Sequence, residues 1–264
     1  MQCRRVHEHL IEAGKVVLLQ VQADEIRVKA LSGIYWRASA MEVRSQLWLG
    51  GALSRHRDVQ LIRALLLRVC ACGLLERILL VTDGLSSYKS QALKVFRKPL
   101  HIGKVGRPRL VLPAGVMIAR VIKRYQRRRV VEVIGRVVVG SEAEVISRVI
   151  GTQRSIRALI NTAYFERLGA TFRARLAPLA RRTRARAHKQ CTLECGMWLV
   201  GSCYNLLCRH CSRGEEECTP AMAAELTNHR CTMEELLTFP TPPAELPGWR
   251  GRKPRWLLEA ERAT

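Results

Sequence analysis

The chain has 264 residues, of which 48% are apolar, so it can bury a hydrophobic core and is not a disordered polycation. Its 45 Lys and Arg residues outnumber 22 Asp and Glu residues, which gives a formal net charge of +23. Arginine supplies 36 of these cations. Because the planar guanidinium suits phosphate groups, the composition predicts a nucleic-acid partner. No stretch is typical of a membrane anchor or a secretory signal, so we expect a cytoplasmic protein without membrane contact.

The ten cysteines are expected to be reduced thiols that act as small core residues or as metal ligands. The densest cluster of Cys and His residues comprises Cys208, His210, Cys211, Cys218, His229 and Cys231. It contains one C-x-x-C pair and one H-x-C pair, whereas structural zinc sites usually have two clean half-sites. Zinc binding by Cys208, His210 and Cys211 therefore stays open, and buried or loop thiols are the alternative.

The first third of the chain predicts a sheet followed by a helix and a strand. Extended patterns from Lys15 to Gly50 indicate three consecutive strands. A helix capped by Ser54 is expected to run to about Cys72. The apolar run RILLVTDG then indicates a buried strand that ends at Asp83.

The rest of the chain predicts helices around one further strand. A helix over 87–96 comes first, then a Pro- and Gly-rich basic loop insertion near 98–115. VVEVIGRVVVG is expected to be a strand, and the segment from Ser141 a short helix. A long helix over Thr162–Arg186 and an apolar helix over 191–207 follow. The order of three antiparallel strands, helix, strand, helix, strand and helices predicts a mixed α/β fold and argues against a doubly wound sheet.

Three acids stand where they could carry chemistry in this basic chain. Asp24 lies near the end of the first strand, Asp83 ends the strand after the first helix, and Glu166 lies in the first turns of the long helix. Acids from two strands and a helix can converge to hold two divalent cations. Taken alone, the same residues also fit a turn at Asp83-Gly84 and a salt-bridging glutamate.

Residues 160–187, INTAYFERLGATFRARLAPLARRTRARA, resemble the helix that carries the catalytic glutamate in the insertion-sequence-one family of bacterial transposases. QVQADEIRVK and LLVTDGLSSY resemble the family's two aspartate strands, and YNLLCRH and CTPAMAAELTNH resemble its tail. The resemblance extends from about residue 16 to 239. It implies a ribonuclease H-like fold in which Asp24, Asp83 and Glu166 form an Asp-Asp-Glu set that binds two Mg²⁺ ions, with Mn²⁺ as a substitute.

The resemblance further implies a DNA transposase that cuts element ends and joins the 3′-hydroxyl to target DNA by two-metal phosphodiester chemistry. Such an enzyme would act as a homo-oligomer on double-stranded DNA in the bacterial nucleoid. The chain has Gly169 where the family has Asn. An inactive transposase remnant that binds DNA without sequence specificity is the alternative.

The resemblance also suggests four parts of the chain. Residues 1–14 are expected to be the remnant of an upstream region, 15–190 the catalytic domain, 191–239 a helical extension, and 240–264 a Pro/Arg-rich tail. An upstream DNA-binding subunit or a frame-shifted N-terminal region would supply recognition of element ends.

Clusters of arginine predict the surfaces that contact DNA phosphates. The residues expected to bind DNA are Arg124, Arg127, Arg128, Arg173, Arg175, Arg181, Arg182, Arg250 and Arg252.

Overall fold

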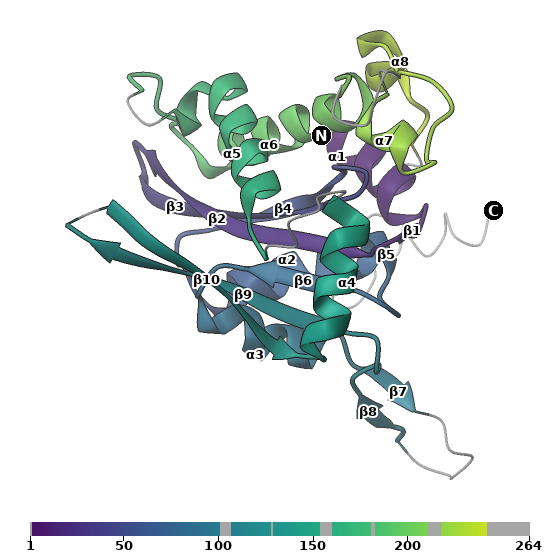
Figure 1. The fold of residues 1–264 in the computed structure, drawn as a ribbon. Coiled ribbons are helices and arrows are strands. Elements are labelled where there is room, and N and C mark those ends of the chain that lie inside the picture. Colours follow the sequence, from purple (N-terminus) through teal and green to yellow (C-terminus); the bar gives the residue numbers. More distant parts are fainter. Residues whose placement is uncertain are drawn as a thin grey trace, which may run out of the picture.

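The computed structural model describes residues 2–100, 107–127, 129–153, 160–180, 183–210 and 218–241. A six-stranded mixed sheet with the order β10-β9-β6-β2-β3-β4 forms its centre (Figure 1). The strands are β2 (Gln20–Ala30), β3 (Gly33–Glu42), β4 (Trp48–Ser54), β6 (Leu79–Thr82), β9 (Met117–Gln126) and β10 (Arg129–Val139). The expected mixed α/β class is confirmed.

The strand directions follow from the connections. β2, β3 and β4 form an antiparallel meander, in which Asp24 pairs with Ser39. β6 lies parallel to β2 on the other side, β9 lies parallel to β6, and β10 returns antiparallel to β9. Two short pairs lie outside the sheet: β1 (Val16–Val17) with β5 (Gly73–Leu74), and β7 (Lys98–Leu100) with β8 (Arg109–Val111).

Helices cover both faces of the sheet. One face packs against α2 (Val59–Cys72) and α3 (Ser86–Val95) through a core that includes Val21 and Ala23 of β2. The other face packs against α4 (Glu142–Gln153), α5 (Ala163–Arg175) and α6 (Gln190–Leu206) (Figure 1). Because side chains alternate along a strand, the β2 side chains on one face pack in one hydrophobic core. Those on the opposite face pack in another.

Short helical segments complete the layer that contains α6. They are α1 (Gln2–His7), the π-helical turn η1 (Glu8–Glu12), the 3₁₀ turn η2 (Ala177–Leu179), α7 (Pro220–Ala223) and α8 (Met233–Thr238). Val6 and His7 of α1 are buried, and α1 packs against α6 and α8. The first residues of the chain therefore belong to the packed body.

α6 closes one edge of the sheet at Trp48 of β4. The buried Asn205 side chain accepts a hydrogen bond from the Trp48 backbone N–H at 2.9 Å and donates one to the Trp48 carbonyl at 2.8 Å. Gly201 allows this approach, because a Cβ there would lie 2.0 Å from the Trp48 ring. Asn205 thus takes the place of a neighbouring strand at this residue.

Several sequence predictions differ from the structure. Ser54 ends β4 and does not cap α2; the cap is Asp58, which accepts from the Leu61 N–H at 3.0 Å. The predicted long helix ends at Arg175, and Pro178 lies in η2, because proline lacks the N–H that would continue the helix.

The region after α3 also differs. The basic segment near 98–115 was predicted to be a loop, but β7 and β8 at its two ends pair as a hairpin. β9 was not predicted as a strand, because Arg120, Lys123 and Arg124 obscure its apolar alternation. The predicted Pro/Arg-rich tail lies outside the described residues from 242 onward.

Candidate functional site

Asp24 and Asp83 meet where the ladder between the parallel strands β2 and β6 ends. The expectation that Asp24 lies near the end of its strand is wrong, because β2 continues beside β3 to Ala30. The β2–β6 ladder runs from Gln20–Leu79 to Ala23–Thr82, and each aspartate is the next residue in its strand direction. Both therefore reach the same edge of the ladder, although 59 positions separate them in the chain. The sequence prediction that these two carboxylates lie side by side agrees with this geometry.

Glu25 joins the two aspartates. Carboxylate oxygens of Asp24, Glu25 and Asp83 all lie within 4.8 Å of one another. Glu25 faces the α2/α3 side of the sheet, opposite to Asp24, as strand alternation predicts, but it is 8% exposed and not a surface residue. The Asp24 side chain turns back along the strand, so that Oδ1 accepts from the Glu25 backbone N–H at 2.7 Å.

Two side chains from the α2/α3 side hold this cluster. Arg57 donates from Nε to Glu25 at 2.5 Å and from Nη2 to Asp83 at 3.1 Å. The buried Tyr88 hydroxyl of α3 donates to the second oxygen of Glu25 at 2.9 Å. One guanidinium and one phenol therefore fix the position of Glu25 and tie it to Asp83.

Burial and neighbouring charges raise the pKa of two of these carboxyl groups. Burial raises the pKa of Asp24 to about 7, and the negative charges of Glu25 and Asp83 add to this effect. Burial, followed by the charge of Asp83, also raises the pKa of Glu25. Arg57 offsets part of both shifts. The cluster thus holds three acids around one bridging guanidinium, and a bound cation would offset the repulsion between them.

Glu166 lies at the start of α5, across from the two aspartates. Its Oε1 contacts Lys123 Nζ of β9 and accepts from the Thr162 hydroxyl at 3.2 Å. Its side chain is 52% exposed, and it does not belong to the group of oxygens within 4.8 Å. The structure therefore brings Asp24 and Asp83 together and leaves Glu166 beside them, paired with a lysine.

Gln22 positions the helix that bears Glu166. This fully buried β2 side chain accepts from the Phe165 backbone N–H at 3.0 Å and donates to the Asn161 carbonyl at 2.8 Å. Phe165 N–H is one of the first amides of α5, which have no partner within the helix. Gln22 thus caps α5 from the strand that carries Asp24, two residues away.

A cavity of about 330 Å³ opens between these elements. Its lining includes Asp24, Asp83, Gly84, Lys123 and Thr162. Both acids in this lining offer oxygen ligands only, which suits a hard cation such as Mg²⁺ better than a soft metal. The three clustered acids fit the same class of ion. Lys123 and Thr162, which contact Glu166, complete the wall.

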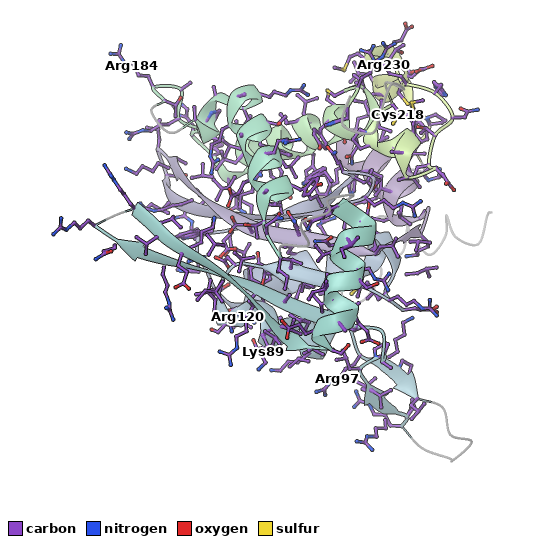
Figure 2. All side chains as sticks on the ribbon, in the orientation of Figure 1. Lys89, Arg97, Arg120, Arg184, Cys218 and Arg230 are labelled. Carbon is purple, nitrogen blue, oxygen red and sulfur yellow. The ribbon has the colours of Figure 1, made fainter. Side chains whose placement is uncertain are left out.

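Basic side chains gather near the foot of β9, where Lys89, Arg120 and Arg136 line one pocket; Figure 2 labels the first two. Arg120 Nη2 of β9 donates to the Gly84 carbonyl at 2.7 Å, which fixes the turn after Asp83. Arg124 pairs with Glu132 across the β9–β10 hairpin, and Arg127 is exposed at its tip. The hairpin projects from the body of the molecule (Figure 1). It therefore presents cations well away from the core.

The other arginines predicted to bind DNA divide into two groups. Arg173 is half-buried in the last turns of α5, and Arg175 is exposed and donates to the Cys208 sulfur at 2.6 Å. The remaining predicted residues lie outside the described part of the chain: Arg128, Arg181, Arg182, Arg250 and Arg252.

The cysteine cluster near the C-terminus is only partly described. Cys211 lies outside the described residues, His210 and Cys218 form a backbone bridge, and His210 packs edge-on against Tyr204. His229, Cys231 and Glu235 lie together at the start of α8, where Glu235 completes a capping box with Thr232.

The sequence prediction missed Gln22, Arg57 and Tyr88 as parts of the site. Gln22 contacts Phe165 of α5, and Arg57 and Tyr88 contact Glu25 of β2. These contacts span 143, 32 and 63 residues of the chain, respectively. The one available signal was a polar Gln two residues before Asp24 on the same face of a buried strand.

No protein-family model matches the sequence, and no curated protein matches it. One similar solved chain belongs to the cryo-EM structure of the simian T-cell lymphotropic virus intasome in complex with PP2A regulatory subunit B56 gamma. The two chains are 9% identical with a TM-score of 0.45, and the similarity covers 90% of this chain and 62% of that chain. At this TM-score the likeness does not establish a shared fold. Among the described helices, none has the length and apolar character needed to cross a membrane.

Proposed function

We propose that this chain is a ribonuclease H-like DNA strand transferase of the Asp-Asp-Glu transposase kind. The observation that carries the proposal is the meeting of Asp24 and Asp83 at the end of the parallel β2–β6 ladder. Lys123 and Thr162, which contact Glu166, line the same cavity as the two aspartates. The sheet supports the proposal: the antiparallel meander β2-β3-β4 is followed by α2, the parallel strand β6, α3 and the parallel strand β9, which agrees with the element order that the sequence predicts. The family resemblance of the three segments that carry these acids supports it independently.

Asp24 and Asp83 would hold the divalent cations, and Glu166 would join them after leaving Lys123. When bound, two Mg²⁺ ions would activate the attacking oxygen and stabilise the leaving oxygen of the phosphodiester. Arg57 holds Glu25 and Asp83 in place, so Asp83 would keep its orientation when the cations bind. Thr162 and Gln22 orient the first turn of α5, and the exposed cations of the β9–β10 hairpin would contact the DNA backbone.

The alternative, an inactive DNA-binding remnant, also has an observation in its favour. Lys123 pairs with Glu166, and Arg57 bridges Glu25 and Asp83, so side-chain cations already neutralise two of the acids. A protein of this kind would keep the basic surface and bind DNA without cutting it.

Nicking of a supercoiled plasmid separates the two functions. We expect the wild type to nick in the presence of Mg²⁺ and Asp83→Asn to lose this activity while it still binds duplex DNA. Asp58→Asn is the matched control, because it makes the same chemical change outside the cluster and asparagine also caps helices. Equal nicking by wild type and Asp83→Asn would exclude the strand-transferase proposal and leave the DNA-binding one.

A further inference from the structure

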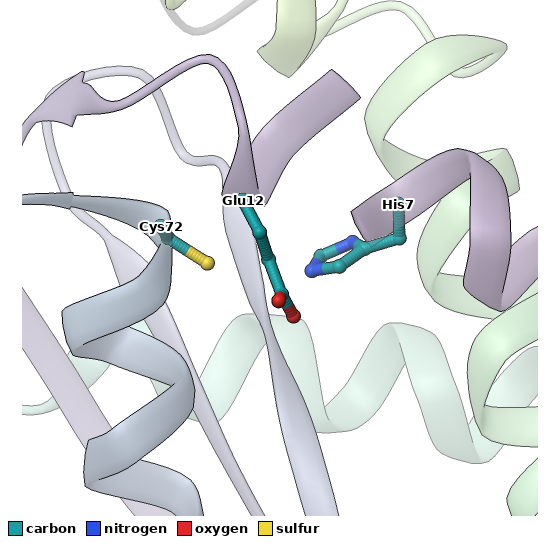
Figure 3. A group of neighbouring side chains, drawn as sticks. All are labelled: His7, Glu12 and Cys72. Carbon is teal, nitrogen blue, oxygen red and sulfur yellow. The ribbon is translucent and has the colours of Figure 1, made fainter. Parts of the chain in front are cut away.

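His7, Glu12 and Cys72 converge in a second cluster, which shares no residue with the carboxylate site (Figure 3). A ring nitrogen of His7, a carboxylate oxygen of Glu12 and the sulfur of Cys72 all lie within 4.8 Å of one another. His7 is 1% exposed and Cys72 is fully buried, whereas Glu12 is half-buried. The three residues come from α1, η1 and α2.

The π-helical turn creates this arrangement. In an α-helix, residues five apart point about 140° away from each other, because one turn takes about 3.6 residues. In η1 the Ala13 N–H bonds to the Glu8 carbonyl five residues back at 3.2 Å, so the turn is wider. His7 and Glu12, also five apart, therefore reach one face, towards Cys72 at the end of α2. Single π-helical turns are frequent at functional sites.

His7 is a buried polar side chain whose weak contact with the Leu49 backbone is its hydrogen-bonding interaction among the described residues. Neither ring nitrogen has a hydrogen-bond partner of good geometry among the described residues. Burial, followed by the charge of Arg68, lowers the pKa of His7 to about 3, while the nearby backbone of Leu49 opposes this slightly. The imidazole is therefore neutral at physiological pH and offers a lone pair. Trp48 and Trp198 pack against the ring at 5.1 and 5.0 Å between centroids and shield it from water.

The side chains of Cys72 and Glu12 are also of types that bind transition metals. Cys72 donates its thiol hydrogen to the Leu49 carbonyl at 3.2 Å, and burial raises the pKa of this thiol. Glu12 accepts from Arg68 Nη1 at 2.9 Å through Oε1. Arg68 also lies 3.9 Å from Glu8 and over the Trp198 ring. Arg68 thus keeps an acidic partner if Glu12 turns to a metal.

We propose that His7, Glu12 and Cys72 form a zinc site that ties the N-terminal helical segment to α2. An imidazole, a thiolate and a carboxylate are three ligand types that Zn²⁺ takes, and a water molecule on the side of the half-buried Glu12 can supply the fourth. Binding would release the Cys72 thiol proton to solvent, so the charges of the thiolate and Glu12 balance the ion. The soft sulfur and the nitrogen distinguish this site from the oxygen-only carboxylate site, which suits Mg²⁺.

The cluster of His229, Cys231 and Glu235 is the competing place for zinc. His229 and Cys231 are more accessible than His7 and Cys72, and both carboxylate oxygens of Glu235 are already engaged, one with His229 and one with the Thr232 N–H. His7 is buried and makes no hydrogen bond of good geometry with a described residue, whereas His229 is exposed and lies 2.8 Å from the Asn228 side-chain oxygen. The test therefore includes a variant of Cys231.

The test is a titration of the full-length, chelator-treated protein with Co²⁺ and then Zn²⁺. We expect wild type to show a near-ultraviolet thiolate-to-cobalt band that Zn²⁺ displaces, and to unfold at a higher temperature with Zn²⁺. Cys72→Ser should lose one metal equivalent and the associated band. Cys70→Ser, on the same helix outside the cluster, and Cys231→Ser should keep both. No uptake by wild type, or equal uptake by wild type and Cys72→Ser, overturns the proposal.

A second variant covers the case in which Cys72→Ser does not fold, which far-ultraviolet circular dichroism would show. Glu12→Gln keeps the size of a half-buried side chain and removes one ligand charge. We expect its zinc affinity to fall at least tenfold, since even outer partners of metal ligands contribute roughly 10–100-fold. An affinity within twofold of wild type would overturn the proposal by itself.

Discussion

The Gln22 side chain of β2 accepts a hydrogen bond from the Phe165 backbone N–H, and this contact joins the strand of Asp24 to the helix of Glu166. Replacing Gln22 by Met keeps the volume but removes the hydrogen bond from the Phe165 amide and the one that Gln22 donates to the Asn161 carbonyl. We expect a loss of about 1–3 kcal/mol in the free energy of unfolding, measured by urea denaturation. Mg²⁺-dependent nicking should fall further than the folded fraction, because α5 loses its cap.

Gln91→Met is the control for this prediction. Gln91 is also buried, but the hydrogen bond that its side chain donates to the Ser90 hydroxyl is long at 3.5 Å. If both variants lose equal stability and activity, the bond from Gln22 to α5 has no special role.

Two glycines on neighbouring helices should respond in opposite ways to alanine. Gly169 of α5 has helical φ and a Cβ there would lie 3.4 Å from Ile26, an ordinary contact, so Gly169→Ala should stabilise the fold by about 0.5–1 kcal/mol. Gly201→Ala of α6 places its Cβ 2.0 Å from the Trp48 ring and should cost several times that amount, roughly 1–3 kcal/mol or more. Thermal unfolding of both variants checks the pair. A stabilising Gly201→Ala would contradict the packing of α6 on β4.

Arg37 should be a source of instability. It is 2% exposed, none of its guanidinium nitrogens has a hydrogen-bond partner among the described residues, and it lies 3.9 Å from the Phe172 ring centroid. Burial, with the charge of Arg173, lowers its pKa to about 9, so the side chain is charged at neutral pH in both folded and unfolded chains. Because an apolar replacement removes a buried charge, Arg37→Met should raise the free energy of unfolding by about 1–4 kcal/mol. A lower unfolding temperature for this variant would argue that Arg37 has an anionic partner.

When no metal is bound, the free energy of unfolding should fall as the pH drops. The pKa of His7 is about 3 in the folded chain, below its ordinary value of 6.5, so the unfolded chain binds the proton first. The stability that comes from keeping His7 neutral in the folded chain is fully present above pH 6.5. It is lost as the pH falls towards 3. Between pH 7.5 and 5.5, with chelator present, wild type should lose about 1 kcal/mol more than His7→Phe. Equal losses in urea titrations of the two proteins would place His7 in contact with water or an acid.

Affinity for nonspecific duplex DNA should fall steeply with salt. If exposed arginines such as Arg127 neutralise phosphates, the logarithm of the binding constant should decrease linearly with the logarithm of salt, by about 0.9 per phosphate contact. Arg127→Ala should reduce that slope by about one contact at most. Fluorescence anisotropy between 50 and 200 mM salt would show this, and a flat response would mean that these arginines serve internal pairs.

The sequence predicts the two strands that carry Asp24 and Asp83 better than it predicts the side chains that surround these acids. Asp24 and Asp83 could be placed on strands because each lies within or directly after an apolar run, although β2 continues beyond Asp24 to Ala30. The Arg57 bridge and the Gln22 cap could not be predicted, since they join residues that only the tertiary fold brings together. β9 was missed because its outer face is charged. His7 and Glu12 were missed because five-residue spacing indicates one face only when the turn is π-helical.

The two hydrogen bonds between Asn205 and Trp48 make the two edge strands of the central sheet, β4 and β10, unequal. On the β4 side, an amide from α6 already uses the Trp48 N–H and carbonyl that another strand would need. On the β10 side, Val130, Val131 and Val133 are about half-exposed. A second copy of the chain that joined by strand addition would therefore meet resistance at one end and an apolar ladder at the other. Assembly of this kind would be directional, with β10 as the side on which the sheet can grow.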